Sequence, residues 1–426
     1  MNILFLMKYY EIGGIESVTA VLGSCFLRHG HNVTLATFNE PIPMALARTD
    51  KAIKVYTLGK YECSQKNVAA LRKILVEHRI NVVINQWGLP YIPIKTLCKA
   101  KQGLNVKVIS VYHNQVDTNA RLKAVEQAML VCNNPLLKCL LICKHKAFKL
   151  VTSLSMRYVY KHSDVYEVLS PSFLELFKKF TGIKHPTKLI SQTNPITLND
   201  SSCNIALTTL NKQKEIIYVG RLDNVQKRVS RVIDTWSLLE KKFPDWHLTI
   251  VGDGEDKQAL EEQVKTLGLK RVYFEGFKNP AEYYKRASML LLTSDFEGFG
   301  LVIVEGMRYG VVPFVYGSYP AIYDIVTDNK DGIILPMNEN GYDAVAMAGK
   351  MSELMSAHLK LEQMANEAIE KSKLFSLETI YKQWNNEFLK LDMGGVKCQP
   401  LRITYMLKQK EVICVGRLDN VQKRVG

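Results

Sequence analysis

The 426-residue chain lacks the features of several special classes of protein. It has no run of 18 or more apolar residues, which a membrane-spanning helix needs. Its opening stretch, MNILFLMKYYEIGG, is too short and too soon acidic for a secretion signal. Nine cysteines lie scattered without a repeating spacing, which is typical of reduced thiols in a cytosol rather than of a disulfide framework. We therefore expect a cytoplasmic protein.

Ordinary globular composition excludes a disordered or low-complexity chain, because 47% of the residues are hydrophobic and 23% are charged. The length predicts two or three domains. No second ligand pair accompanies the tightest group of possible zinc ligands, so we expect no structural metal. That group is Cys139, Cys143 and His145.

Positive charge is concentrated in the first half of the chain. The formal net charge is +15, and residues 1–200 hold 26 Lys and Arg against 12 Asp and Glu. Residues 201–392 hold 23 against 27. A basic half indicates a polyanionic partner, which leaves nucleic acid, an anionic membrane or a phosphorylated substrate.

Two series of apolar, β-branched strands alternate with helical patterns. The first lies between residues 3 and 170 and includes ILFLM (3–7), and the second includes EIIYVG (215–220). Such alternation is typical of parallel sheets covered on both faces. We predict an α/β protein with two doubly wound domains whose ligands bind at the carboxyl ends of the strands, in the cleft between the domains.

A break in this alternation predicts the domain boundaries. The Asn/Asp/Ser-rich stretch that follows Asn194 and Pro195 indicates a linker. We place an N-terminal domain at 1–195, the linker at 196–214 and a C-terminal domain at 215–374.

The chain also repeats itself once. KQKEVICVGRLDNVQKRVG (408–426) differs from KQKEIIYVGRLDNVQKRVS (212–230) at three of nineteen positions. The second copy stops after one strand and a loop, and an isolated strand cannot satisfy its edges. We interpret 393–426 as a truncated duplicate and expect it to be poorly ordered.

The strongest chemical signal is the segment TSDFEGFGLVIVEGMRYG (293–310). Glu297 and Glu305 flank a glycine-rich turn that leads into a helical pattern. Their carboxylates can accept hydrogen bonds from the hydroxyls of a sugar and a ribose on either side of a phosphate. Free backbone N–H groups at the start of such a helix form an anion site. These N–H groups would belong to Phe299, Gly300 and Leu301.

Two glycine-containing loops accompany this segment. GRLDNVQKR (220–228) places Arg221 and Lys227 after a strand, where a guanidinium and an ammonium suit a diphosphate. In EIGGIESV (11–18), Gly13 and Gly14 let the backbone approach a ligand closely. Solvated charges on a surface helix and a basic turn are the alternative interpretation of these segments.

Together these motifs resemble the family 4 glycosyltransferases of the GT-B fold over about residues 1–392. The Glu-x7-Glu element, the GR…K loop, GGxE, VGDG (251–254), NPI (194–196) and FSLETIYKQWNNEFLKL (375–391) occur in the family's order. The resemblance implies two Rossmann-like domains with parallel sheets facing a cleft. It also implies that the final helix, 375–392, packs back on the first domain.

The resemblance implies a role for each residue at the donor site. Arg221 and Lys227 would hold the donor diphosphate, Glu297 the hydroxyls of the transferred sugar and Glu305 the nucleotide ribose. Gly14 would close over the phosphates from the other domain. The segment GFKNP (276–280), with Phe277, lies where the family contacts the nucleobase. Lys227 is followed by Arg228, where many members have glycine, so this loop departs from the usual form.

The resemblance further implies a retaining transferase (class EC 2.4) that uses a nucleotide-sugar as co-substrate and needs no metal or other cofactor. No Asp-x-Asp pair occurs in the sequence, in agreement with metal independence. His113 ends a strand of the first domain, where family members often carry a histidine that receives the acceptor's proton. A histidine that only orients a loop is the alternative. The expected mechanism is attack by the acceptor hydroxyl on the face from which the diphosphate leaves.

The basic half includes a segment that suits a membrane surface. No acidic residue occurs over 127–163, and lysines alternate with leucines in PLLKCLLICKHKAFKL (135–150). A basic amphipathic segment at 135–161 is typical of helices that bind anionic membranes. Lysines lying over an ordinary core are the alternative. No nucleic-acid-binding motif accompanies the charge, so we expect no nucleic-acid partner.

We therefore predict transfer of a sugar to a glycan or lipid-linked acceptor in cell-surface polysaccharide biosynthesis, of the lipopolysaccharide, capsule or O-antigen type. The protein would work in the cytoplasm, bound peripherally to the cytosolic face of the inner membrane. Two alternatives stay open: a nucleotide-sugar epimerase or hydrolase of similar architecture, and a catalytically inactive, transferase-like binding subunit.

Overall fold

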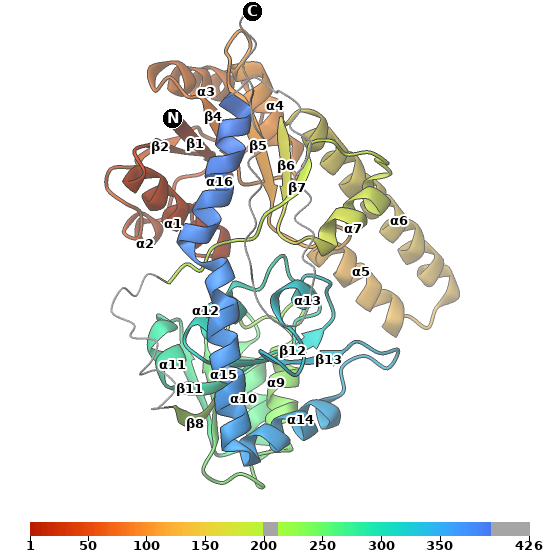
Figure 1. Cartoon of the computed structure of the whole chain (residues 1–426). Helices are drawn as coiled ribbons and strands as arrows, with labels where there is room; N and C mark the ends of the chain where they lie inside the picture. The colour runs from red at the N-terminus through yellow and green to blue at the C-terminus, as the bar shows by residue number, and fades with distance from the viewer. Residues whose placement is uncertain (199–211, 393–426) are drawn as a thin grey trace, which may run out of the picture. The chain divides into compact units, whose positions relative to one another are not determined.

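The computed structural model of the chain describes residues 1–198 and 212–392 (Figure 1). Met1–Asn385 forms one compact unit that contains both sheets. The predicted domain boundaries therefore stay predictions. The predicted poor order of 393–426 falls outside the described residues, as does most of the predicted linker.

The first sheet has seven parallel strands in the order β3-β2-β1-β4-β5-β6-β7. The chain starts in the middle of this sheet, builds outward to β3 and then returns to build the other side. Its strands are β1 (Asn2–Met7), β2 (Asn32–Thr37), β3 (Lys54–Thr57), β4 (Val82–Asn85), β5 (Lys107–Tyr112), β6 (Val165–Val168) and β7 (Leu189–Ser191).

The second sheet repeats this topology with six parallel strands in the order β10-β9-β8-β11-β12-β13. In both sheets the chain adds its second and third strands on one side of the first strand and the later strands on the other side, which is the doubly wound pattern predicted from the sequence. The strands are β8 (Gln213–Val219), β9 (His247–Val251), β10 (Val272–Gly276), β11 (Ala287–Leu292), β12 (Val312–Gly317) and β13 (Ile333–Pro336).

Helices lie on both faces of each sheet (Figure 1). The first sheet is accompanied by α1 (Gly14–Arg28), α2 (Pro43–Leu46), α3 (Gln65–Glu77), α4 (Tyr91–Ala100), α5 (Ala120–Val131), α6 (Pro135–Lys161) and α7 (Ser172–Thr181). The second is followed or accompanied by α9 (Val229–Ser237), α10 (Lys257–Thr266), α11 (Ala281–Arg286), α12 (Leu301–Arg308), α13 (Ile322–Ile325), α14 (Ala344–Ser356), α15 (His358–Ser372), the 3-10 turn η1 (Lys373–Phe375) and α16 (Leu377–Asp392).

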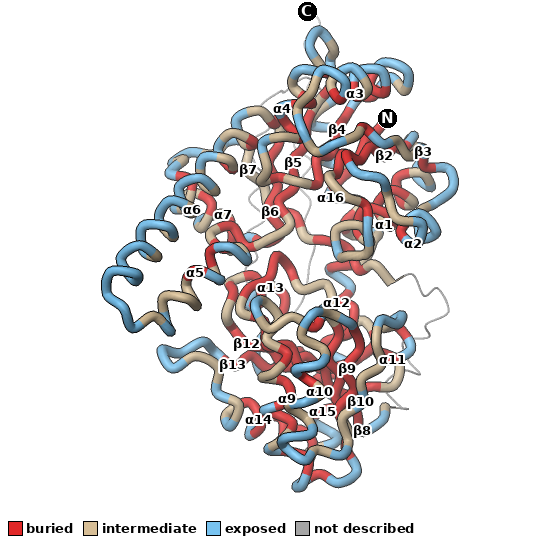
Figure 2. Tube along the Cα trace, turned by 180° about the vertical axis from the view of Figure 1, so that it is seen from behind, coloured by how far each residue is buried: buried red, intermediate tan, exposed pale blue. Residues whose placement is uncertain are grey.

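The strands form the cores, because helices bury them from both sides. Every residue of β4 and of β11 is buried, and Figure 2 shows inner strands such as β4 in red, with exposed surfaces of the surrounding helices in pale blue. Continuous apolar runs such as Val82–Asn85 therefore belong to central parallel strands, as predicted. Two details differ from the prediction. The short, half-buried β7 has too few residues to be predicted, and β8 begins at Gln213, inside the predicted linker.

The chain returns to the first sheet in α16. Tyr381 stacks on His29 of α1 with ring centroids 3.6 Å apart, and Trp384 meets Phe26 edge-on at 5.9 Å. Trp384 is 3% exposed. Aromatic packing thus ties the first part of this helix to α1.

One carboxylate links the segment after β6 to α13. Asp324 accepts hydrogen bonds from the Ser170 hydroxyl and, at 3.1 Å, from the backbone N–H of Ser172. Ser172 is the first residue of α7, so this N–H has no acceptor within its own helix. A residue that follows the second sheet's β12 therefore caps a helix packed on the first sheet.

Candidate functional site

Glycines bring two strand ends of the second sheet into backbone contact. A Cβ atom on Gly252 would lie 1.8 Å from the carbonyl oxygen of Gly220, and one on Gly254 would lie 2.3 Å from that of Leu222. The N–H of Leu222 donates to the carbonyl of Asp253 at 2.9 Å. The VGDG motif therefore holds the GRLDNVQKR loop in place through its lack of side chains.

Lys227 and Glu297 form an ion pair at the carboxyl ends of β8 and β11. The Lys227 Nζ and Glu297 Oε1 atoms are 2.5 Å apart, and the Ser294 hydroxyl donates to the same oxygen at 2.7 Å. The side chains are 19% and 8% exposed. Two residues predicted to contact donor phosphate and sugar thus lie side by side, with their charges balanced.

Arg221 lies apart from this pair. Its side chain is 61% exposed and donates to Asp223 at 2.7 Å and to Gln226 at 3.3 Å. A guanidinium held only by such exposed contacts is free to turn toward an anionic ligand.

The backbone conformation at Arg228 is one that favours glycine. Its φ angle of 54° lies in the left-handed region, which costs a residue with a Cβ atom about 1–2 kcal/mol. Its Nε donates to Asp295 at 2.8 Å, and Arg231 donates to the other oxygen of Asp295 at 2.6 Å. The loop therefore keeps its left-handed turn, and the Arg228 side chain is engaged with Asp295.

Two helix N-termini meet across the sheets. A Cβ atom on Gly14, the first residue of α1, would lie 3.2 Å from Leu301, the first residue of α12. Neither helix has a side-chain cap, and the residue before α12, Gly300, has φ 93°. The positive ends of the two helix dipoles therefore lie near the glycine-rich turn, where they favour an anion, and the carboxylate of Glu16 lies in the first turn of α1.

His113 is held by a chain of hydrogen bonds at the end of β5. Its Nε2 lies 2.6 Å from the Gln86 side-chain oxygen, while the Gln86 amide donates to Thr19 at 3.1 Å and Thr19 donates to the carbonyl of Ile15 at 2.8 Å. Because the Gln86 oxygen accepts, Nε2 carries the proton and Nδ1 is the acceptor. Nδ1 is buried and has no hydrogen-bond partner among the described residues. Burial lowers the pKa of His113 to about 3, so the ring is neutral at pH 7.

The turn after β11 packs directly on His113. A Cβ atom on Gly298 would lie 2.0 Å from the His113 carbonyl oxygen. This contact brings the turn that follows Glu297 against the backbone at the end of β5, although the two segments belong to different sheets. Only glycine fits at position 298 without a shift of backbone.

Glu305 is buried within α12 and is 5% exposed. The Thr197 hydroxyl donates to its Oε1 at 2.5 Å. Burial raises the pKa of Glu305 to about 7, against the hydrogen bonds from Thr197, which lower it. The carboxyl group is therefore poised to gain or lose a proton near neutral pH.

The two aromatic residues of the predicted site, Phe299 and Phe277, contact other parts of the chain. Phe299 is 3% exposed and packs against Phe375 at 5.5 Å between centroids, so its backbone alone faces the helix start. Phe277, after the edge strand β10, is 53% exposed and lies 5.7 Å from the Arg48 guanidinium.

The structure thus brings together Gly14 with Leu301, Lys227 with Glu297, and His113 with the turn between Glu297 and Gly300. Among the described residues, the side chains of Arg221, Glu305 and Phe277 form no hydrogen bond, ion pair or ring contact with these pairs. Sequence reasoning missed Gln86 and Thr19, which orient His113, and Asp295, which holds the basic loop. A signal existed for Gln86, because it directly follows a buried strand at the carboxyl edge of the sheet.

The residues 1–198 and 212–392 contain no group of three or more His, Cys, Asp or Glu side chains that could hold a metal ion. Within the same part of the chain, no helix is both long and apolar enough to cross a membrane.

Two family descriptions match the chain: Glycosyltransferase Family 4 over residues 12–191, and Glycosyl transferases group 1 over residues 206–371. A Campylobacter jejuni relative, "GalNAc-alpha-(1->4)-GalNAc-alpha-(1->3)-diNAcBac-PP-undecaprenol alpha-1,4-N-acetyl-D-galactosaminyltransferase", is 24% identical over 395 residues, which are 90% of this chain and 97% of the relative. The amylovoran biosynthesis glycosyltransferase AmsD of Erwinia amylovora is 21% identical over 88% of this chain and 95% of the AmsD chain.

The crystal structure of HepE from Anabaena with UDP and glucose has a TM-score of 0.69 at 16% identity, covering 91% of this chain and 99% of the HepE chain. This likeness confirms the predicted GT-B fold.

Proposed function

The chain belongs to the family 4, group 1 glycosyltransferases, and we propose that it moves a sugar from a nucleotide-diphosphate donor to a glycan or lipid-linked acceptor, with retention of anomeric configuration. The names of the relatives support a role in cell-surface polysaccharide biosynthesis, since one acts on an undecaprenol-linked glycan and the other makes amylovoran.

The observation that carries the proposal is the meeting of two uncapped helix N-termini at Gly14 and Leu301. A diphosphate placed there would accept hydrogen bonds from both helices, and the dipoles would stabilise its charge. Lys227 would exchange part of its contact with Glu297 for a phosphate oxygen, and Arg221 would turn from Asp223 to the diphosphate. No metal or other cofactor is needed in this scheme, because these groups balance the charge of the leaving diphosphate.

The other predicted residues would recognise the rest of the donor. Glu297, next to the glycine-rich turn, would accept hydrogen bonds from sugar hydroxyls, and Glu305 would accept them from the ribose. Phe277 is exposed enough to stack on a nucleobase.

His113 is suited to orient the acceptor rather than to hold its proton. A base with a pKa of about 3 takes up little proton at neutral pH, whereas its free Nδ1 lone pair can accept a hydrogen bond from the attacking hydroxyl. The acceptor oxygen would form its bond to the anomeric carbon as the bond to the diphosphate breaks on the same face. The hydroxyl proton would pass to the departing diphosphate oxygen, which gains negative charge as it leaves.

Calorimetric binding of UDP, GDP and ADP with EDTA present tests the donor site. We expect one nucleotide to bind wild type, and to bind the Arg221→Ala variant about tenfold or more weakly because a charge-assisted contact is lost. The matched control is Arg121→Ala, an exposed arginine on α5. Absence of binding by wild type would contradict the proposal and favour an inactive subunit.

Turnover separates the proposal from the epimerase and hydrolase alternatives. A transferase consumes the nucleotide-sugar at a rate that depends on added acceptor. Consumption that ignores the acceptor would favour hydrolysis or epimerisation instead.

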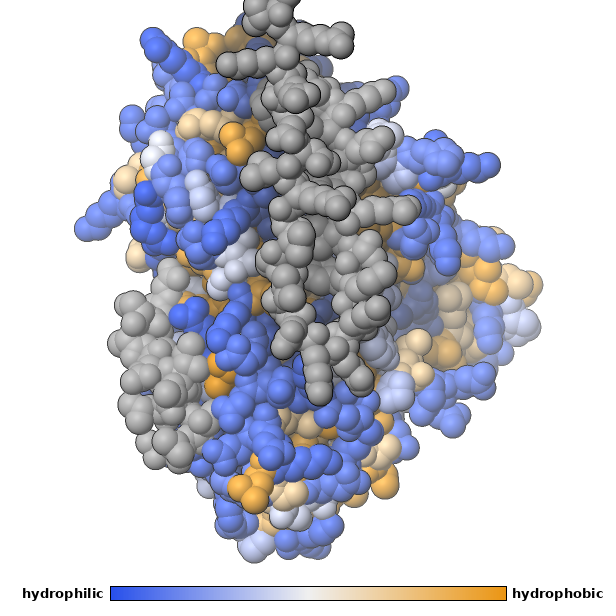
Figure 3. Space-filling model, in the orientation of Figure 1, coloured by the Kyte–Doolittle hydropathy of each residue, from blue (hydrophilic) through white to orange (hydrophobic). Residues whose placement is uncertain are grey.

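We propose that α5 and α6 bind an anionic membrane surface. These helices expose a row of apolar side chains, and in Figure 3 the flank that they occupy shows orange atoms among blue ones. No acidic residue accompanies the exposed lysines of α6. The most exposed apolar residues of these two helices are Leu130 (84%), Val131 (80%), Leu136 (78%), Leu140 (66%), Val151 (63%) and Leu150 (60%).

A basic, apolar face of this kind gains both from burial of leucine side chains and from attraction to anionic lipid. It would hold the protein at the cytosolic membrane face, near a lipid-linked acceptor. We expect co-sedimentation with vesicles containing phosphatidylglycerol and not with neutral vesicles. Lys138, Lys144 and Lys149 changed together to Glu should abolish it, whereas the same change at the exposed Lys241, Lys265 and Lys360 should not. Equal loss in both variants would contradict the assignment to α6.

A further inference from the structure

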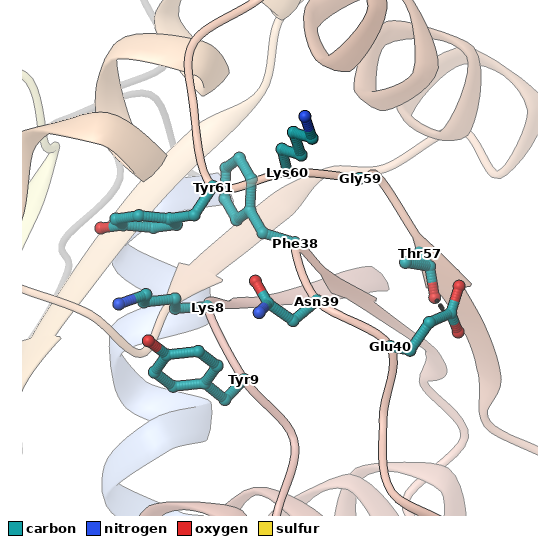
Figure 4. A pocket seen from close by; sticks show the side chains of 9 residues that line it. All are labelled: Lys8, Tyr9, Phe38, Asn39, Glu40, Thr57, Gly59, Lys60 and Tyr61. Carbon is teal, nitrogen blue, oxygen red and sulfur yellow. Dashed lines mark hydrogen bonds between the residues drawn. The ribbon is translucent and has the colours of Figure 1, made fainter.

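An open pocket of about 500 Å³ lies at the carboxyl ends of β1, β2 and β3 (Figure 4). Lys8 and Tyr9 follow β1, Phe38 follows β2, and the loop after β3 supplies Lys60 and Tyr61. None of these residues belongs to the donor site described above.

The walls of this pocket are built into the fold. Phe38 is fully buried, and its ring meets that of Tyr61 edge-on at 5.2 Å between centroids. Asn67 is 2% exposed and donates from its amide to the carbonyls of Lys60 and Glu62, both at 2.8 Å. These two bonds fix the loop that carries Lys60 and Tyr61, so the pocket keeps its shape without a ligand.

Two lysines and one glutamate line the pocket, so its formal charge is positive. The Lys8 ammonium lies between two rings, 4.2 Å from the Tyr9 centroid and 4.4 Å from the Tyr61 centroid, as Figure 4 shows. Within the described residues, neither Lys8 nor Lys60 has a carboxylate within 4.0 Å. The pocket's own carboxylate, on Glu40, accepts from the Thr57 hydroxyl at 3.0 Å instead.

Aromatic side chains connect the pocket with the candidate reaction centre. Tyr9 meets Trp87 edge-on at 5.7 Å, and Trp87 directly follows Gln86, which holds His113. The indole N–H of Trp87 is buried, and no acceptor for it lies in the part of the chain that the structure describes. His113 ends β5, and the sheet order runs β3-β2-β1-β4-β5, so neighbouring strands about 4.8 Å apart place the pocket roughly 10–20 Å from His113.

We propose that this pocket is a subsite for an acidic sugar residue of an acceptor oligosaccharide. The oxyanion would contact the Lys8 ammonium, the exposed Lys60 side chain would turn toward it from the loop after β3, and the aromatic rings would pack against the sugar's C–H faces. Its distance from His113 suits a residue some way along the acceptor chain from the attacked hydroxyl. The inference rests on the proposed function, because it assumes a saccharide acceptor.

Binding of saccharide probes to the full chain, without nucleotide, tests the inference by calorimetry at low salt. The probes are hyaluronan tetrasaccharide, which is carboxylated, glucose 6-phosphate, and neutral maltotetraose. We expect one or both anionic probes to bind about tenfold or more tightly than maltotetraose, because charge-assisted hydrogen bonds are the stronger ones. Which anionic probe binds distinguishes a carboxylate from a phosphate.

Lys60→Met, at an exposed position, should weaken the affinity for the anionic probe about tenfold. Lys8→Met should weaken this affinity to a similar extent, whereas Lys8→Arg, which keeps the charge, should retain it. Lys51→Met, at an exposed position away from the pocket, is the control. Equal binding of neutral and anionic probes, or equal loss in the control, would overturn the inference. If a nucleotide still binds while no anionic probe does, only this inference fails. If an anionic probe binds while no nucleotide does, the proposed donor function fails instead.

Discussion

Glu305 offers a prediction in which stability and ligand binding change in opposite directions with pH. Its pKa is about 7 in the folded protein and 4.5 ordinarily, because burial disfavours the charged form. Below pH 4.5 both folded and unfolded states hold the proton, so this group contributes no pH dependence. Between pH 4.5 and 7 only the folded state holds it, so the free energy of unfolding falls as pH rises. The total loss is about 3 kcal/mol and is complete just above pH 7.

Nucleotide binding should show the reverse trend. If Glu305 accepts hydrogen bonds from ribose hydroxyls, the carboxylate is the competent form. At pH 5.5 a group with a pKa of about 7 is only about 3% ionised, so affinity should be about 30-fold weaker than at pH 8.5. The affinity therefore rises with pH and levels off above pH 7, where the free protein is least stable with respect to this group.

Glu305→Gln separates this group from all others that titrate. Glutamine keeps an acceptor oxygen and cannot ionise, so the variant should lose both pH dependences and be more stable than wild type above pH 7. Urea unfolding followed by tryptophan fluorescence measures stability, and calorimetry measures nucleotide affinity, each from pH 5 to 8.5. The wild-type-minus-variant difference removes the titration of the nucleotide phosphate. A flat difference in stability would refute the raised pKa, and a flat difference in affinity alone would refute the ribose contact.

Three further predictions concern the loops and their supports. Arg228→Gly should be about 1 kcal/mol more stable than Arg228→Ala in urea unfolding. Both variants lose the contact with Asp295, but only alanine retains the free-energy cost of a left-handed backbone conformation. Equal stabilities would mean that the turn relaxes in the alanine variant. Gln86→Leu should lower kcat about tenfold or more with nucleotide affinity unchanged, because the His113 ring is no longer oriented; an unchanged kcat would remove His113 from the mechanism. Gly298→Ala should lower the free energy of unfolding by about 1–3 kcal/mol, because its methyl group would meet the His113 backbone. An unchanged stability would contradict the close contact between residue 298 and the His113 carbonyl.

Much of the fold could be predicted because parallel strands buried on both faces have continuous apolar sequences. VVIN and MLLLTS stand out in the sequence for this reason, and they are the central strands β4 and β11. The three-residue β7 could not be predicted, because its half-buried side chains carry no such pattern. Its place is set by pairing with β6, a tertiary contact.

The candidate site was predictable where local backbone chemistry decides it. Glycines before a helix indicate a phosphate-binding turn from sequence alone, as at Gly300. The ion pair of Lys227 with Glu297 and the support of His113 by Gln86 join residues far apart in sequence, so only the folded chain brings them together. Likewise, burial decides the pKa values of His113 and Glu305, and burial is not readable from either residue's neighbours in the sequence.

Asp324 gives the two sheets a thermodynamic dependence on each other. The first N–H of α7 has its acceptor on α13, so any separation of these segments would return that N–H to water and remove a negative charge from the positive end of α7. Caps of this kind contribute about 0.5–2 kcal/mol. Amide hydrogen exchange at Ser172 therefore reports separation of these two segments: protection there should increase when a ligand draws the sheets together, and should be lost in an Asp324→Ala variant.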